Sequence, residues 1–128
     1  MRSFSGYAPV VLRLGLAAVF FWFGFTQIFD QSGWTGLIPA WITSLTGMSA
    51  ETIVLFNGIA EVIGAFLLAC GFYTRIVAAL LALHLLTIIF DVGLGAVGVR
   101  DAGLMFALIS VALAEPDTYT ADVRFRRI

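Results

Sequence analysis

The chain has 128 residues, of which 61% are hydrophobic and 12% charged, with a formal net charge of −1 at pH 7. A mean hydropathy of +1.03 excludes an ordinary water-soluble domain, because so few charged side chains cannot cover its surface. The seven basic residues are all Arg and form no stripe that could follow a nucleic acid, so we expect no nucleic-acid partner. A single Cys and a single His exclude an internal disulfide and a bis-His haem site, and we expect no metal site. The composition predicts one integral membrane domain, residues 1–128.

Four apolar segments are close to the roughly 20 residues that a helix needs to cross a membrane. They are residues 7–29, 52–72, 74–91 and 99–115, followed by a tail at 116–128. The first segment is longer than the apolar run of a signal peptide, about 7–15 residues, and contains Arg13 and Gln27, so we expect it to be retained. The sequence therefore predicts an all-α membrane protein, a bundle of four transmembrane helices.

The first loop contains a further short helix, predicted over residues 39–46 between Pro39 and Gly47. Trp41 within it is a residue type that settles at the membrane interface. We expect this helix to be an interfacial anchor, and the alternative is a lid over the mouth of the bundle. Ser49 is predicted to cap the helix that follows.

The distribution of Arg predicts the orientation, because cytoplasmic loops carry an excess of basic residues. Residues 30–51 contain none, and Arg100, with acidic neighbours Asp91 and Asp101, is the exception. The basic residues on the predicted cytoplasmic side are Arg2, Arg75, Arg124, Arg126 and Arg127. We therefore expect both termini in the cytoplasm and the protein in a prokaryotic inner membrane.

Glu61 and His84 are the most unusual residues of the predicted spans, because both lie deep in apolar sequence. Glu61 is about nine residues, or roughly 14 Å, from the start of its span, and His84 is about ten residues, or roughly 15 Å, from the start of its own. In a hydrocarbon layer about 30 Å thick, both lie near the middle on adjacent antiparallel helices. A charged side chain at that depth must be paired, protonated or in contact with water.

Helical spacing places further polar side chains on the same inward faces. Asn57 shares a face with Glu61, and Arg13 shares one with Gln27. We expect Arg13 to pair with Glu61 in a buried cluster that also includes His84, and the alternative is that Arg13 extends to the head groups of the inner surface.

Such a cluster has two interpretations. It could bind a polar head group inside the membrane, most naturally a quinone, with Arg13 and His84 as donors and Glu61 as proton relay. Aromatic walls are predicted from Phe20, Trp22 and Phe56, and no covalently bound cofactor is expected. The candidate ligand-binding or proton-relay residues are Arg13, Gln27, Asn57, Glu61, His84 and Asp101. The alternative is that the ionic cluster only fixes the packing of the helices.

Three stretches together resemble the DoxX family of small four-helix membrane proteins, over about residues 7–115. They are "VLRLGLAAVFFWFGFTQIF", "GIAEVIGAFLLACGFYTRIVAALLALHLL" and "VRDAGLMFALISVAL". The landmarks of the resemblance are Arg13–Gly15, Glu61, Gly64, Gly71–Arg75 and Arg100–Asp101. Proteins similar to this family include membrane subunits of thiosulfate:quinone oxidoreductase and of terminal quinol oxidase, so the resemblance implies a quinone-linked role.

The sequence thus leaves two main hypotheses and a weaker third. The first is a membrane subunit of a quinone-linked redox complex, in which any redox cofactor belongs to a partner or is a mobile lipid-soluble molecule. The second is a non-catalytic scaffold or assembly partner. The third is a small-molecule permease, disfavoured because four short helices leave little room for a gated path. In each case we expect the lipid bilayer and membrane or cytoplasmic proteins, or further copies of the chain, as partners.

Overall fold

The computed structural model describes residues 4–126, apart from the side chain of residue 126, and these residues form helices without any strand. Arg2 and Arg127, together with the side chain of Arg126, lie outside the described part, so this part of the topology prediction is not addressed. The four long helices are α1 (Ala8–Phe29), α3 (Ala50–Cys70), α4 (Thr74–Val92) and α5 (Ala96–Leu113). Each is long and apolar enough to cross a membrane. The predicted four-helix membrane bundle is therefore confirmed.

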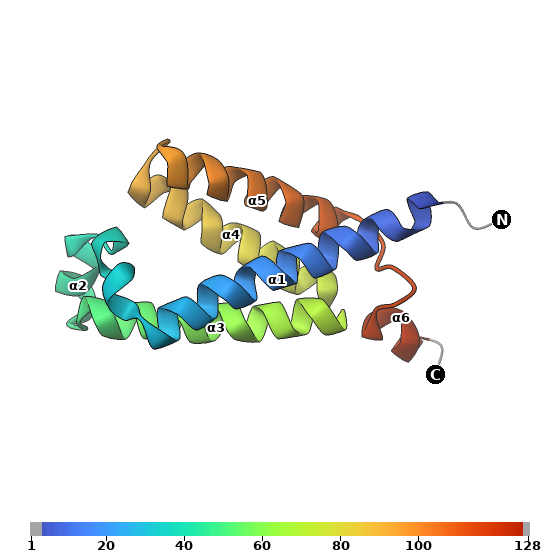
Figure 1. Ribbon diagram of the computed structural model, residues 1–128, viewed down its shortest axis with the longest axis horizontal. Helices are drawn as coiled ribbons and strands as arrows, with labels where there is room; N and C mark the ends of the chain where they lie inside the picture. Colours follow the sequence, from blue (N-terminus) through green and yellow to red (C-terminus); the bar gives the residue numbers. More distant parts are fainter. Residues whose placement is uncertain (1–3, 127–128) are drawn as a thin grey trace.

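The shorter elements lie at the two ends of this bundle (Figure 1). They are the 3-10 helices η1 (Phe4–Tyr7), η2 (Gln31–Gly33) and η3 (Thr35–Leu37), and the α-helices α2 (Ala40–Thr46) and α6 (Ala121–Arg126). α2 lies with the α1–α3 connection at one end, which we call the loop end. The first and last described residues lie near the other, the terminal end.

Local capping explains where the helices begin and end. The Ser49 side chain accepts a hydrogen bond from the Thr52 amide, so α3 begins at Ala50, two residues before the predicted start. α3 ends at Cys70, two residues before the predicted end, because Gly71 adopts a left-handed conformation with φ 72°. α5 begins at Ala96, three residues earlier than predicted, and ends at Leu113 because Ala114 is already extended ahead of Pro116.

The four long helices pack as two pairs, α1 with α3 and α4 with α5, and the pairs touch each other less extensively. Small residues permit the close approach: a Cβ atom on Gly24 of α1 would lie 2.8 Å from the Gly58 oxygen of α3. The apolar core lies mainly in the terminal half of the bundle. Among its most buried members are Ala17, Phe20, Ala65, Leu68, Ala78 and Leu108.

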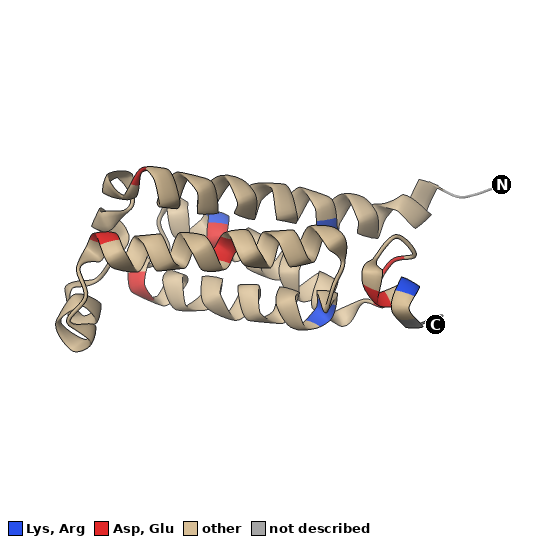
Figure 2. Cartoon of the chain, turned by 90° about the horizontal axis from the view of Figure 1, so that it is seen from below, with Lys and Arg blue, Asp and Glu red and all other residues tan. Residues whose placement is uncertain are grey.

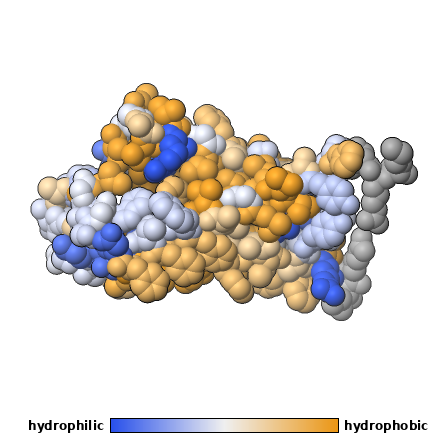
Figure 3. Space-filling view, viewed as in Figure 1, coloured by the Kyte–Doolittle hydropathy of each residue, from blue (hydrophilic) through white to orange (hydrophobic). Residues whose placement is uncertain are grey.

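The surface has the division expected of a membrane protein. The sides of the bundle are mostly hydrophobic, and hydrophilic residues gather toward the ends (Figure 3). Large apolar side chains such as Phe66, Leu80 and Phe106 are exposed on these sides. Most of the basic positions lie toward the terminal end, and one lies beside acidic positions nearer the middle of the bundle (Figure 2). This pattern agrees with a cytoplasmic terminal end, and the orientation itself stays a prediction.

Candidate functional site

A cavity of about 240 Å³ separates the two helix pairs in the loop half of the bundle. All four long helices and the loop at the loop end contribute to its walls. Its polar lining includes Gln27, Asn57, Glu61, His84, Arg100 and Asp101. Five of the six candidate residues from the sequence therefore surround one space, and the exception is Arg13.

Two side-chain amides hold the Glu61 carboxylate, which is only 4% exposed. Gln27 Nε2 donates to Glu61 Oε2 over 2.9 Å, and Asn57 Nδ2 lies 3.2 Å from Oε1 as a second donor. Asn57 Nδ2 also donates to Gln27 Oε1 over 2.6 Å, which links the two amides. Because α1 and α3 approach closely here, the carboxylate is fixed in orientation and its charge is partly offset by donors.

His84 lies on α4 opposite this carboxylate, as its depth in the sequence predicts. Its Nε2 is 3.4 Å from Glu61 Oε1, an ion-pair distance if the ring is protonated. The geometry is not that of a hydrogen bond, and the buried Nε2 has no hydrogen-bond partner among residues 4–126. His84 therefore brings a nitrogen without a hydrogen-bond partner next to the Glu61 carboxylate.

Arg100 and Asp101 form a second polar group on α5. Arg100 Nε donates to Asp101 Oδ1 over 3.1 Å, and Nη2 lies 3.1 Å from the same oxygen. The Arg100 guanidinium carbon lies 4.7 Å from the centre of the Phe23 ring, within the range of a cation–π contact. Asp101 is 3% exposed, so this pair is anchored in the bundle and not a surface topology signal.

The aromatic walls of the cavity differ from the predicted ones. Phe20 lines it as expected, but Trp22 and Phe56 are 63% and 57% exposed on the outside of the bundle, so their prediction as walls is wrong. Their positions on α1 and α3 face lipid. Phe23 and Trp34 line the cavity in their place, and their rings pack edge to face at 5.7 Å.

The loop at the loop end covers the cavity and also exposes large apolar side chains. Ile42 of α2, Pro39 and Trp34 line the cavity, whereas Trp41 and Leu45 are exposed. The short helix is thus present where it was predicted. It presents one face outward, as an interfacial anchor would, and contributes its other face to the cover of the cavity.

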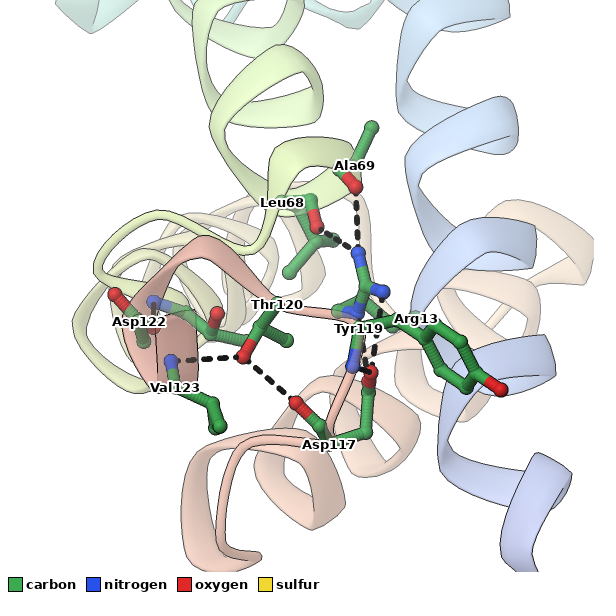
Figure 4. Close-up of polar contacts among 9 residues, drawn as sticks. Arg13, Leu68, Ala69, Asp117, Tyr119, Thr120, Asp122 and Val123 are labelled. Atoms are coloured by element: carbon green, nitrogen blue, oxygen red, sulfur yellow. Dashed lines mark hydrogen bonds and ion pairs between the residues drawn. The ribbon is translucent and has the colours of Figure 1, made fainter. Parts of the chain in front are cut away.

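The predicted pairing of Arg13 with Glu61 is wrong. Arg13 Nε donates to Asp117 Oδ2 over 2.8 Å, and Nη1 donates to the carbonyl oxygens of Leu68 (2.9 Å) and Ala69 (Figure 4). Arg13 is in the second turn of α1, level with the end of α3, where carbonyl groups lack helical partners. Glu61 lies seven residues, or roughly 10 Å, before Leu68 along α3. Asp117 is therefore nearer than Glu61 to the Arg13 side chain. Arg13 therefore links the end of α3 to the segment after α5 at the terminal end.

The segment after α5 folds back onto the bundle beside Arg13. The two oxygens of the Asp122 carboxylate accept hydrogen bonds from the backbone amides of Tyr73 (2.6 Å) and Thr74 (2.7 Å), at the start of α4. The Asp122 amide donates to the Gly71 oxygen over 3.0 Å. The sequence predicted residues 116–128 as a tail beyond the last span, whereas residues 117–122 pack against the ends of the bundle helices.

Sequence reasoning missed Asp117, Phe23, Trp34 and the role of Arg100. The signal for Arg100 was present, because it is the one basic residue that breaks the positive-inside pattern and it precedes an acid. Asp117 follows the last span at the end where Arg13 enters the bundle, and this proximity was the available signal for their pairing.

Comparison with known proteins agrees with this architecture. The DoxX family model matches residues 8–94, which cover α1 to α4 with Glu61 and His84 and leave α5 with Arg100 outside the match. No curated protein and no solved structure matches the chain. Within residues 4–126, no group of three or more His, Cys, Asp or Glu could hold a metal ion. Because the family model covers more than half of the sequence, the chain belongs to the DoxX family.

Proposed function

We propose that this protein is a membrane subunit of a quinone-linked redox complex and binds a quinone ring in the cavity of the loop half. The observation that carries the proposal is the arrangement around Glu61 and His84. A carboxylate fixed by two amides faces an imidazole nitrogen without a hydrogen-bond partner, and both line a cavity with aromatic walls. Ligand sites of this kind combine apolar walls with a few convergent polar groups.

The residues around the cavity fit a quinone ring. A volume of about 240 Å³ is slightly below the usual range of ligand pockets, roughly 300–1,000 Å³. It would therefore suit one ring and leave an isoprenoid chain among the surrounding lipid. Phe20, Phe23 and Trp34 offer faces on which a ring can pack. A bound quinone would supply the two-electron, two-proton chemistry, and this chain would bind and orient the ring and keep bulk water from it.

Within this proposal, Glu61 and His84 handle the proton. His84 Nε2 could hydrogen-bond a ring oxygen and exchange a proton with it, and the Glu61 carboxylate, whose Oε1 lies 3.4 Å from that nitrogen, could take up a proton that a quinol releases. Because the chain has one Cys and one His, the electrons would pass to a redox centre in a partner protein. The chain would thus be an accessory subunit that depends on that partner for turnover.

The alternative is that the Glu61 cluster only fixes helix packing in a scaffold protein. One observation supports this alternative. The buried Arg13–Asp117 pair joins α1 to the segment after α5, so this chain does use a buried ion pair for packing. The two proposals differ in whether the cavity holds a ligand, and this difference can be measured.

The test is purification into lipid nanodiscs, followed by mass spectrometry of bound quinone, for the wild type, Glu61→Gln and Glu51→Gln. Glu51 is the matched control, because it is an exposed acid in the first turn of the same helix and does not line the cavity. We expect bound quinone in the wild type and in Glu51→Gln, and its loss in Glu61→Gln with unchanged helix content. Absence of quinone from all three, with no binding of an added short-chain quinone, would favour the scaffold.

A further inference from the structure

Arg100 is held in one place by contacts on two sides. Asp101 engages its Nε and Nη2, and Phe23 lies under the guanidinium plane. No described residue accepts a hydrogen bond from Nη1, although Arg100 lines the cavity and is 44% exposed. An Arg side chain fixed in this manner loses little freedom when it donates to a ligand, because its planar fork is already oriented.

A second available donor comes from another helix. His84 Nε2, on α4, also lacks a hydrogen-bond partner and lines the same cavity. Between the two donors the walls are largely apolar, with Phe20 and Leu85 among them. Two donors from different helices, both lining one largely apolar cavity, are suited to a flat ring that carries two hydrogen-bond acceptors.

We propose that Arg100 is a specificity-determining residue, which donates through Nη1 to one carbonyl of a ring whose opposite carbonyl is bound at His84. The cavity would then select para-dicarbonyl rings over rings with a single carbonyl. This inference rests on the proposed function, because it names the chemistry by which the same cavity recognises its occupant. It assigns to Arg100 the donor role that the sequence assigned to Arg13.

The size of the effect follows from the value of one charge-assisted hydrogen bond. Such a bond accounts for roughly a tenfold to a hundredfold difference in affinity between ligands that differ in one acceptor. A ring with one carbonyl loses this contact and leaves Nη1 without a partner. Removal of the guanidinium should therefore abolish the preference for the dicarbonyl ring and leave the affinity for the mono-carbonyl ring nearly unchanged.

Ligand binding can be measured as quenching of Trp34 fluorescence, because Trp34 lines the cavity and quinones quench tryptophan fluorescence on contact. The experiment uses the full chain in nanodiscs with Trp22→Phe and Trp41→Phe, so that Trp34 alone reports. A short-chain para-benzoquinone is titrated, and an analogue that lacks one ring carbonyl competes with it. The variants are Arg100→Gln, the pair Arg100→Gln with Asp101→Asn, and Arg124→Gln as an exposed control.

The paired variant matters because Arg100→Gln alone leaves the buried Asp101 carboxylate without its cation and could disturb the fold. We expect a roughly tenfold to hundredfold preference for the dicarbonyl ring in the wild type and in Arg124→Gln, and a ratio near one in the paired variant. An unchanged ratio in the folded paired variant would overturn this inference alone. Absence of saturable quenching in the wild type would overturn the proposed function and this inference with it.

Discussion

Gly24 of α1 and Gly58 of α3 face each other so closely that neither position has room for a side chain. A Cβ atom on Gly58 would lie 2.8 Å from the Gly24 oxygen and 2.8 Å from Gln27 Cβ. This crossing lies beside the amides that hold Glu61, so a close backbone approach between α1 and α3 also positions the site. Packing and site geometry depend here on the same two residues.

We therefore expect Gly58→Ala to destabilise the protein by about 1–3 kcal/mol, the usual cost of an extra methyl group in a well-packed interface. The free energy of unfolding is measured by circular dichroism in mixed micelles with increasing denaturing detergent. Gly15→Ala is the matched control, because Gly15 is in the interior of α1 with no atom within 4 Å of the added methyl. This control should be neutral or slightly stabilising, and an equal loss in both variants would contradict the prediction.

The Arg13–Asp117 pair yields a second prediction. Both side chains are at most 5% exposed, and removal of one partner from a buried ion pair costs about 3–5 kcal/mol because the other charge remains buried. Arg13→Gln and Asp117→Asn should each lower the free energy of unfolding by about that amount.

The double variant tests whether the two residues act together. It should cost clearly less than the sum of the single variants, because the charge that each one leaves behind is then absent. Additive losses in this double-mutant cycle would show that Asp117 is not the partner of Arg13 that matters for stability.

Asp122 should behave as a cap of α4. Asp122→Ala removes the acceptors of the Tyr73 and Thr74 amides, and loss of a helix cap costs about 0.5–2 kcal/mol. Hydrogen exchange of the segment 71–76 should become faster, whereas Arg124→Ala, an exposed control, should leave it unchanged. Equal exchange in the two variants would mean that the Asp122 contacts contribute little to the order of this turn.

The orientation can be tested with single cysteines in a Cys70→Ala background. Ser32, in η2 of the α1–α3 connection, and Tyr119, in the segment after α5, are both exposed. Because these segments belong to the loop end and the terminal end, Ser32→Cys and Tyr119→Cys report on the two sides. In intact bacterial cells, an impermeant maleimide should label Ser32→Cys and spare Tyr119→Cys, because the basic residues favour a cytoplasmic terminal end. Labelling of Tyr119→Cys alone would show that the orientation is opposite to the predicted one.

The sequence predicts the helices well because length, hydropathy and caps are local properties. Ser49 and Gly71 act through their own backbone and immediate neighbours, so the bounds of α3 were within two residues. The adjacency of Glu61 and His84 was also accessible, since a tight turn between two spans sets their relative depth. The choice of partner for Arg13 was not accessible in the same way, because it depends on how the segment after α5 folds back.

The cavity shows the same limit. Periodicity placed Gln27 and Asn57 on inward faces, but it could not distinguish the lipid-facing Trp22 from Phe23, its neighbour that lines the cavity. That choice depends on the rotation of α1 against α3, which the close contact of Gly24 and Gly58 decides. The wrong assignment of Trp22 as a cavity wall therefore reflects a dependence on helix rotation, which periodicity does not give.

The contact of Arg13 with Asp117 joins residues 104 positions apart in the chain. α1 precedes α3, α4 and α5 in the chain, so Arg13 is synthesised before every group that it contacts. The carbonyl groups of Leu68 and Ala69 become available about midway, and Asp117 only once α5 has emerged from the ribosome. The terminal end can therefore take its final form only after residue 117 has been made, whereas α1 and α3 can pair before that.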